Sequence, residues 1–172
     1  PTMIIVIPGL ILAMYAQAKV KSTFDHYSRV ASAAGLTGGK VARAILDRMG
    51  AAHVEVEMIE GYLNDHYDPR KQVLRLSPQV YKGNSLASLG VAAHEAGHAI
   101  QHSVGYVPLN IRNSLVPVAN FGSTLAFPLF LLGLFISPSL VTVGLYLFAA
   151  VVLFQFVTLP VEFNASSRAM AV

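Results

Sequence analysis

The chain has 172 residues, of which 54% are hydrophobic and only 12% are charged, with a net charge of +3 and no cysteine. A soluble domain carries about 25% charged residues, so this composition excludes an ordinary soluble protein and favours one that crosses a membrane. The lack of cysteine excludes disulfides and thiolate zinc ligands, and no aromatic-basic pattern predicts a nucleic-acid partner.

The N-terminal segment predicts a first transmembrane helix over residues 1–18, which contain no charged side chain. A secretory signal peptide is the alternative interpretation of this apolar run. The basic residues Lys19 and Lys21 follow the run instead of preceding it. This order favours a retained helix.

Residues 19–112 predict one small α+β domain. The first helix is expected to continue through residues 19–34, and a second to follow Thr37 as its N-cap and to stop at Gly50. Alternating apolar residues predict strands over 53–59 and 72–76, with a turn at 64–69 between them. The strand at 72–76 is either an edge strand that binds a substrate backbone or part of a structural hairpin with 53–59.

A helix over about 85–103, capped by Asn84 or Ser85, carries the sequence HEAGH at residues 94–98. Histidines four positions apart lie on one face of a helix, so His94 and His98 can hold one metal ion. Zinc favours such nitrogen ligands and lowers the pKa of its bound water to about 7. Glu95 can reach that water as the catalytic carboxylate, which is the arrangement of zinc peptidases.

The alternative is a helix whose histidines only satisfy neighbouring groups. Residues 85–100 are otherwise small and apolar, which predicts burial on most sides. Burying two histidines and a glutamate there without a metal would leave polar groups poorly paired, which would lower the stability of the fold. The sequence therefore favours a metal site.

An uncharged stretch of 49 residues lies between Arg112 and Glu162 and is long enough for two crossings of about 20 residues each. It predicts a transmembrane hairpin over 113–160, with spans at 115–136 and 140–159 and a turn at Ser137-Pro138-Ser139. Small side chains in the first of these spans allow close packing, either within the chain or in a homo-oligomer: Ala119, Gly122, Ser123 and Ala126.

The basic residues indicate the orientation of these spans. Eleven of the twelve Lys and Arg lie between Lys19 and Arg112, so the middle domain is expected on the cytoplasmic side. The fold class expected is a mainly α membrane protein with about three transmembrane helices and a small α+β zincin-like domain that carries the HExxH helix.

A catalytic zinc site needs a third protein ligand and one open position. A third histidine six residues after His98 is excluded because that residue is Val104, and His102 is a weak candidate. Glu162 is stronger, because the last span should return it to the face that holds the HExxH helix. The alternative role for Glu162 is that of an interfacial anchor.

Several long motifs resemble the bacterial YugP-like family of membrane neutral zinc metallopeptidases, from about residue 4 to residue 171. They read GLTGGKVARAILD, DHYDPRKQVLRLSPQVY, HEAGHAIQ, LVPVANFGS and TLPVEFNASSRA. The resemblance implies one zinc per chain, bound by His94, His98 and Glu162, with residues 161–172 as the third-ligand helix segment. That segment also looks like the corresponding helix of HtpX-type and Ste24-type membrane proteases.

Two departures from the family pattern affect this interpretation. Gluzincins usually carry Asp four residues after the ligand Glu, where this chain has Ser166. The hydrogen-bond partner of a zinc histidine is then either this hydroxyl or a group from elsewhere. Family members also usually continue past residue 172, so the resemblance leaves open whether further catalytic groups lie in such a tail.

The leading hypothesis is a membrane-anchored zinc endopeptidase of the bacterial inner membrane, with residues 19–112 as its metallopeptidase domain. Its expected partners are the lipid bilayer and a peptide or protein substrate, including membrane proteins. The oxyanion donors considered are His66, Tyr67 and Arg168. The alternatives are an intramembrane zinc protease and a non-catalytic, zinc-stabilised membrane scaffold.

Overall fold

The computed structural model describes the backbone of residues 2–171 and the side chains of residue 7 and residues 11–171. Six helices and three short strands follow one another in these residues: α1 (Thr2–Tyr27), α2 (Gly38–Arg48), β1 (Glu55–Met58), β2 (His66–Asp68), β3 (Val73–Leu76), α3 (Pro78–Lys82), α4 (Leu86–Ser103), α5 (Val107–Phe135) and α6 (Pro138–Met170). The chain divides into two compact units, residues 1–96 and 97–172, and the division falls inside α4.

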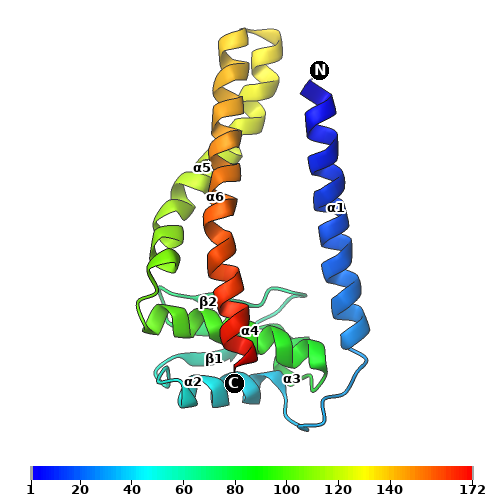
Figure 1. Cartoon of the computed structure of the whole chain (residues 1–172), viewed down its shortest axis with the longest axis vertical. Coiled ribbons are helices and arrows are strands. Elements are labelled where there is room, and N and C mark those ends of the chain that lie inside the picture. Colours follow the sequence, from blue (N-terminus) through cyan, green and yellow to red (C-terminus); the bar gives the residue numbers. More distant parts are fainter. Residues whose placement is uncertain (1, 172) are drawn as a thin grey trace. The chain divides into compact units, whose positions relative to one another are not determined.

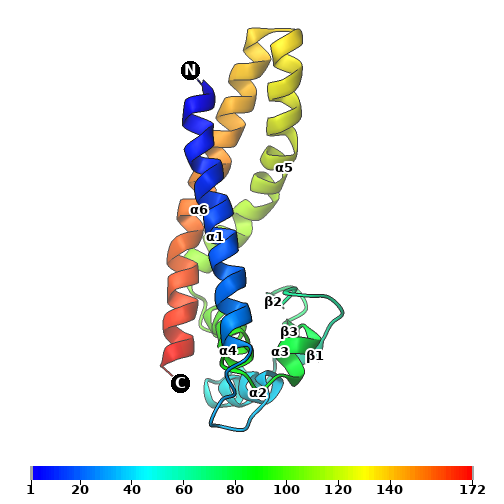
Figure 2. The ribbon, with the colours of Figure 1, turned by 90° about the vertical axis from the view of Figure 1, so that its right-hand side faces the viewer.

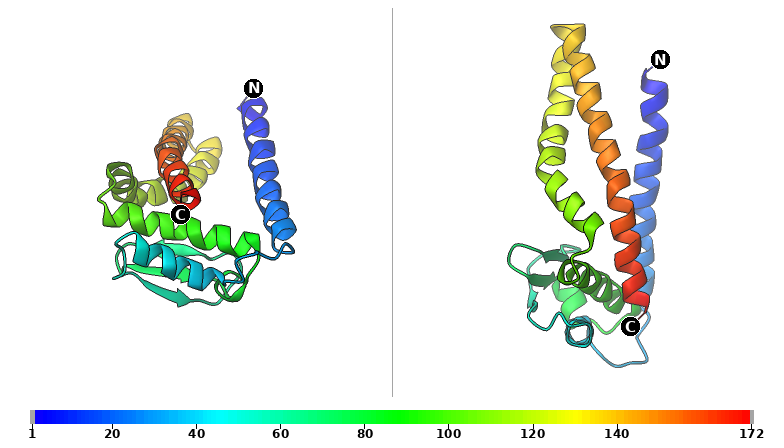
Figure 3. Two further views of the ribbon diagram at one scale, coloured as in Figure 1. Left: turned by 60° about the horizontal axis from the view of Figure 1, so that its bottom comes forward. Right: turned by 60° about the vertical axis from the view of Figure 1, so that its left-hand side comes forward.

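The first unit contains a three-stranded sheet in the order β1-β3-β2, beside α2 (Figure 3). Strand β3 pairs parallel with β1 and antiparallel with β2. Its residues Leu74 and Leu76 are fully buried. The expectation that residues 72–76 form an edge strand is therefore wrong, because both edges of β3 are already paired. The alternative, a hairpin with 53–59, is wrong as well, because β1 and β3 run parallel.

The turn expected at 64–69 contains the short strand β2. Asp68 accepts hydrogen bonds from the backbone N–H groups of Arg70 and Lys71, at 3.0 and 3.2 Å, as its turn propensity suggests. Its other oxygen lies 2.9 Å from Arg75 on β3. Pairing with β3 thus makes a strand of a segment whose local composition favours a turn.

Helix α1 ends at Tyr27, seven residues before the expected end at residue 34. The backbone that follows pairs with the start of α4 instead: Ser32 N–H donates to Asn84 O, and Leu86 N–H donates to Val30 O. These hydrogen bonds, at 2.8 and 2.9 Å, replace the next helical turn.

The caps of two helices agree with the sequence. Thr37 is the N-cap of α2, and its hydroxyl accepts from Lys40 N–H. Of the two residues proposed to cap α4, Ser85 does so: its hydroxyl accepts from Ser88 N–H at 3.1 Å. Side-chain acceptors at these positions satisfy N–H groups that have no partner within the helix.

In the second unit α5 and α6 form an antiparallel hairpin, joined at the turn that Ser137 and Pro138 predict (Figures 1 and 2). Glycines allow the two helices to approach closely. A Cβ atom on Gly144 would lie 2.9 Å from the carbonyl oxygen of Ala126, and one on Gly133 would collide with the backbone of Val141. Gly122 and Ala126 are buried, so these small residues serve packing within the chain.

Among the described residues, α5 and α6 are the two helices long and apolar enough to cross a membrane, where three were expected. Only 11% and 6% of their most apolar stretches are buried inside the protein. A core helix of a soluble protein would be mostly buried. The expected first span coincides with α1, but side chains 1–6 and 8–10 lie outside the described residues, so this span stays a prediction.

The C-terminal half of α4 packs directly on α6 through Gly97. A Cβ atom on Gly97 would lie 2.6 Å from the carbonyl oxygen of Ala165 and 3.2 Å from its Cα. Both neighbours are backbone atoms, which cannot move aside by a change of rotamer. Glycine at position 97 therefore fixes how closely the helix of His98 approaches the helix of Glu162.

We predict that Gly97→Ala forces α6 away from α4, costs about 1–3 kcal/mol of stability and weakens zinc binding. The matched control is Gly90→Ala on the same helix, where a Cβ meets no atom within 4 Å. That control should raise stability by up to about 1 kcal/mol, since Ala is the better helix former. Thermal unfolding and zinc titration in detergent check both variants; equal behaviour of the two would contradict the close contact.

Candidate metal centre

Helix α4 carries His94 and His98 on one face, four residues apart. Although the division into two units falls between Ala96 and Gly97, α4 is one continuous helix, so the helix itself sets the spacing of the two imidazoles. His98 is 9% exposed. Ala96 and Ala99 on the same helix are fully buried.

Glu162 comes from α6, two residues after Pro160. Its Oε2 lies 3.4 Å from His98 Nε2, and 38% of the Glu162 side chain is exposed. The two side chains on either side of Glu162 differ: Val161 is fully buried, while Phe163 is 68% exposed. Glu162 therefore lies at the border of the packed α4–α6 contact.

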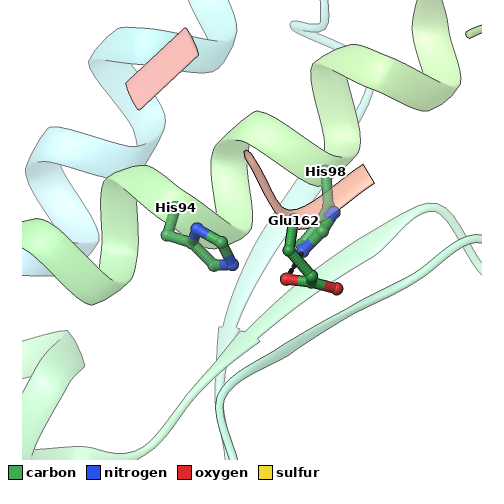
Figure 4. A group of neighbouring side chains, drawn as sticks. All are labelled: His94, His98 and Glu162. Atoms are coloured by element: carbon green, nitrogen blue, oxygen red, sulfur yellow. Dashed lines mark ion pairs between the residues drawn. The ribbon is translucent and has the colours of Figure 1, made fainter. Parts of the chain in front are cut away.

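His94, His98 and Glu162 form the group that could hold a metal ion in the described part of the chain (Figure 4). One ligand atom from each lies within 4.8 Å of the others. Two imidazole nitrogens and one carboxylate oxygen are ligands that Zn²⁺ accepts, and tetrahedral zinc holds such atoms about 3.3–3.5 Å apart. The separation of 3.4 Å between His98 and Glu162 matches this value. The donor set fits zinc.

The other nitrogen of His98 is held by a residue that the sequence analysis did not single out. Gln101 Oε1 lies 3.0 Å from His98 Nδ1. Gln101 is completely buried, and its Nε2 donates to Val161 O at 2.8 Å and to Asn164 Oδ1 at 3.0 Å. The sequence feature that could have pointed to this residue is a glutamine three positions after the second histidine of HEAGH, where it lies near that histidine on the helix surface.

Glu95 and Ser166 lie on the helices that supply the ligands, Glu95 on α4 and Ser166 on α6, and both are partly buried. Each has interactions of its own. Gln101 is a hydrogen-bond partner of His98 Nδ1. The predicted roles of Glu95 and Ser166 stay predictions.

His66 and Tyr67 lie on β2 in the first unit. His66 Nδ1 donates to the carbonyl oxygen of Asn64 at 2.7 Å, which leaves Nε2 as the acceptor in the neutral ring. Burial and, second, the charge of Asp68 raise the pKa of Tyr67 to about 12. The Tyr67 phenol, like an unperturbed tyrosine, is protonated at neutral pH and can donate a hydrogen bond.

Arg168 lies one turn after Asn164 on α6, and its Nε donates to Asn164 Oδ1 at 2.8 Å. Its guanidinium carbon lies 6.0 Å from the centre of the Tyr106 ring, within the range of a cation–π contact. Arg168 thus joins the hydrogen-bonded chain that begins at His98. This placement favours a structural part for Arg168 over the role of oxyanion donor.

Comparisons with known proteins agree with this chemistry. A family model described as "Putative neutral zinc metallopeptidase" matches residues 2–172. The "Putative membrane protease YugP" of Bacillus subtilis (strain 168) is 51% identical over 164 residues, which cover 95% of this chain and 73% of that protein. No solved structure matches. The chain belongs to the neutral zinc metallopeptidase family that this model describes.

Proposed function

We propose that the protein is a membrane-anchored zinc endopeptidase that hydrolyses peptide bonds at the membrane surface. The observation that carries the proposal is the convergence of two imidazoles from α4 and one carboxylate from α6. Membership of a zinc metallopeptidase family supports the metal. Two exposed apolar helices and the name of the Bacillus relative support the membrane.

His94, His98 and Glu162 would hold one zinc ion per chain, the gluzincin arrangement. When bound there, zinc would lower the pKa of a coordinated water to about 7 and polarise the scissile carbonyl. Glu162 would balance one of the two positive charges of the ion. The remaining residues of the site then have to move a proton and stabilise negative charge.

Glu95 follows His94 directly on α4 and is the proposed general base. Its carboxylate accepts a proton from the attacking water and passes that proton to the leaving amine as the peptide bond breaks. Stabilisation of the oxyanion requires a hydrogen-bond donor. Tyr67 is one of the three donors proposed, and with its pKa raised to about 12 its phenol keeps the proton at neutral pH and well above it.

We predict that Glu95→Gln lowers hydrolysis of an unfolded protein by about 10²–10⁴-fold, because the amide cannot accept the proton. Zinc content should stay at that of the wild type, since Glu95 is not one of the three proposed ligands. The measurement is cleavage of a casein-type substrate by detergent-purified protein, together with metal analysis.

The matched control is Glu60→Gln, which neutralises an exposed carboxylate in the first unit and should leave cleavage unchanged. Full turnover by Glu95→Gln would overturn the mechanism. Zinc-loaded wild type that cleaves nothing, and that does not differ from Glu95→Gln in cells, would instead support a zinc-stabilised scaffold.

The proposed orientation in the bacterial inner membrane places the α2–β3 region in the cytoplasm and the α5–α6 turn outside. It rests on the eleven basic residues from Lys19 to Arg112 and on the uncharged hairpin that follows them. In this orientation α5 leaves the cytoplasmic face and α6 returns to it. The ligand Glu162, near the C-terminal end of α6, is then on the side of the basic residues.

We predict that a membrane-impermeant maleimide labels Ser139→Cys in intact spheroplasts and labels Ala52→Cys only after lysis. Both positions are exposed, and the natural chain has no cysteine to react. The two variants serve as controls for each other. Labelling of Ala52→Cys alone in intact spheroplasts would contradict this orientation and indicate the opposite one.

A further inference from the structure

We propose that Gln101 is a positioning residue that fixes the tautomer and the orientation of His98, and that Asn164 and Arg168 act on His98 through Gln101. The inference rests on the proposed role of His98 as a zinc ligand. All of these residues lie within the second unit. The argument follows from which atoms can donate a hydrogen bond and which can only accept one.

The carbonyl oxygen of Val161 fixes which way the Gln101 amide faces. A backbone carbonyl can only accept, so the group 2.8 Å from it must be the NH₂ of Gln101. The amide oxygen Oε1 consequently faces His98 Nδ1 at 3.0 Å. With the amide in this orientation, Nδ1 of His98 must carry the hydrogen.

This proton assignment decides which nitrogen of His98 can bind a metal. In the neutral ring, a hydrogen on Nδ1 leaves the lone pair on Nε2. Nε2 is the nitrogen that lies 3.4 Å from Glu162 Oε2. Gln101 therefore presents the metal-binding nitrogen of His98 to the third ligand before any metal arrives.

The second hydrogen of the Gln101 amide is also accounted for. It goes to Asn164 Oδ1, at 3.0 Å, and the same oxygen accepts from Arg168 Nε at 2.8 Å. Arginine stays protonated in proteins and has no acceptor, so it holds the Asn164 amide with its oxygen toward Gln101. The direction of every bond in the chain from Arg168 to His98 is thereby determined.

The burial of Gln101 explains why these hydrogen bonds can fix the orientation of His98. Gln101 has no exposed surface, so water cannot replace a lost partner. A buried polar group left without a partner costs about 1–3 kcal/mol, which opposes rotation of the amide. Because Val161 precedes Glu162, the same amide also holds the backbone beside the third ligand.

The test is the zinc affinity of Gln101→Met, which keeps an unbranched side chain of similar length but makes no strong hydrogen bond. Loss of the group that orients a metal-bound histidine typically weakens metal binding by about 10- to 100-fold, and we expect a loss of this size. The visible spectrum of the cobalt-substituted protein should change as well, since the His98 ring is no longer held. Competition with a chelator measures the affinity without reference to catalytic activity.

Two further variants separate positioning from general stability. Asn164→Ala, at a less buried position, should weaken zinc binding to a smaller extent, and the double variant should bind zinc no more weakly than Gln101→Met alone. The matched control Ser88→Ala removes a buried hydrogen bond to Gln79 O elsewhere on α4. It should lower the unfolding temperature without changing zinc affinity or the cobalt spectrum.

Unchanged zinc affinity in Gln101→Met, with binding lost in His98→Ala, would overturn the inference while leaving the proposed metal site intact. Additive losses from Gln101→Met and Asn164→Ala would overturn the claim that Asn164 acts through Gln101. If Gln101→Met does not fold, an unchanged cobalt spectrum in Asn164→Ala would contradict the proposed chain of hydrogen bonds from Arg168 to His98. Wild-type protein that binds no zinc would overturn this inference and the proposed function together.

Discussion

The close contact between the C-terminal half of α4 and the end of α6 is the constraint on which the candidate site depends. Glutamate 162 is 64 positions beyond His98 in the sequence, and the α5–α6 hairpin separates them. Two features bring them within 3.4 Å: Gly97 lets the helix backbones touch, and the Gln101 amide bonds the residue before Glu162. The hairpin therefore returns Glu162 to the helix of His94 and His98, which the proposed metal site requires.

The contact between α4 and α6 also contains buried polar side chains that hydrogen-bond to one another. Zinc ligands need fixed orientations, and fixed orientations need buried partners. Gln101 supplies such a partner for His98 from a fully buried position. Both hydrogens of its amide and its oxygen have protein partners, so the polar group is satisfied without water.

Much of this organisation could be predicted from local patterns. The spacing of His94 and His98, the cap at Thr37 and the turn at Ser137-Pro138 each depend on interactions within a few residues. The three-dimensional grouping of Glu162 with the histidines was expected from the return of the last span, and the resemblance to a known family made it specific. Those signals are short-range or motif-based, and they are visible in a single sequence.

The parts that could not be predicted depend on contacts between distant segments. Strand β3 is central because β2 pairs with it, and β2 lies in a segment rich in turn-forming residues. Helix α1 ends early because residues 30–32 bond to residues 84–86. Gln101 was missed because its importance comes from Val161 and Asn164, 60 and 63 positions away.

The most direct test of the central claim is an anomalous diffraction map at the zinc absorption edge, from crystals of the zinc-loaded protein. The account predicts one peak per chain, about 2.0–2.2 Å from a nitrogen of His94, from Nε2 of His98 and from a carboxylate oxygen of Glu162. A peak bound through Nδ1 of His98, a peak away from Glu162, or no peak at all would contradict it.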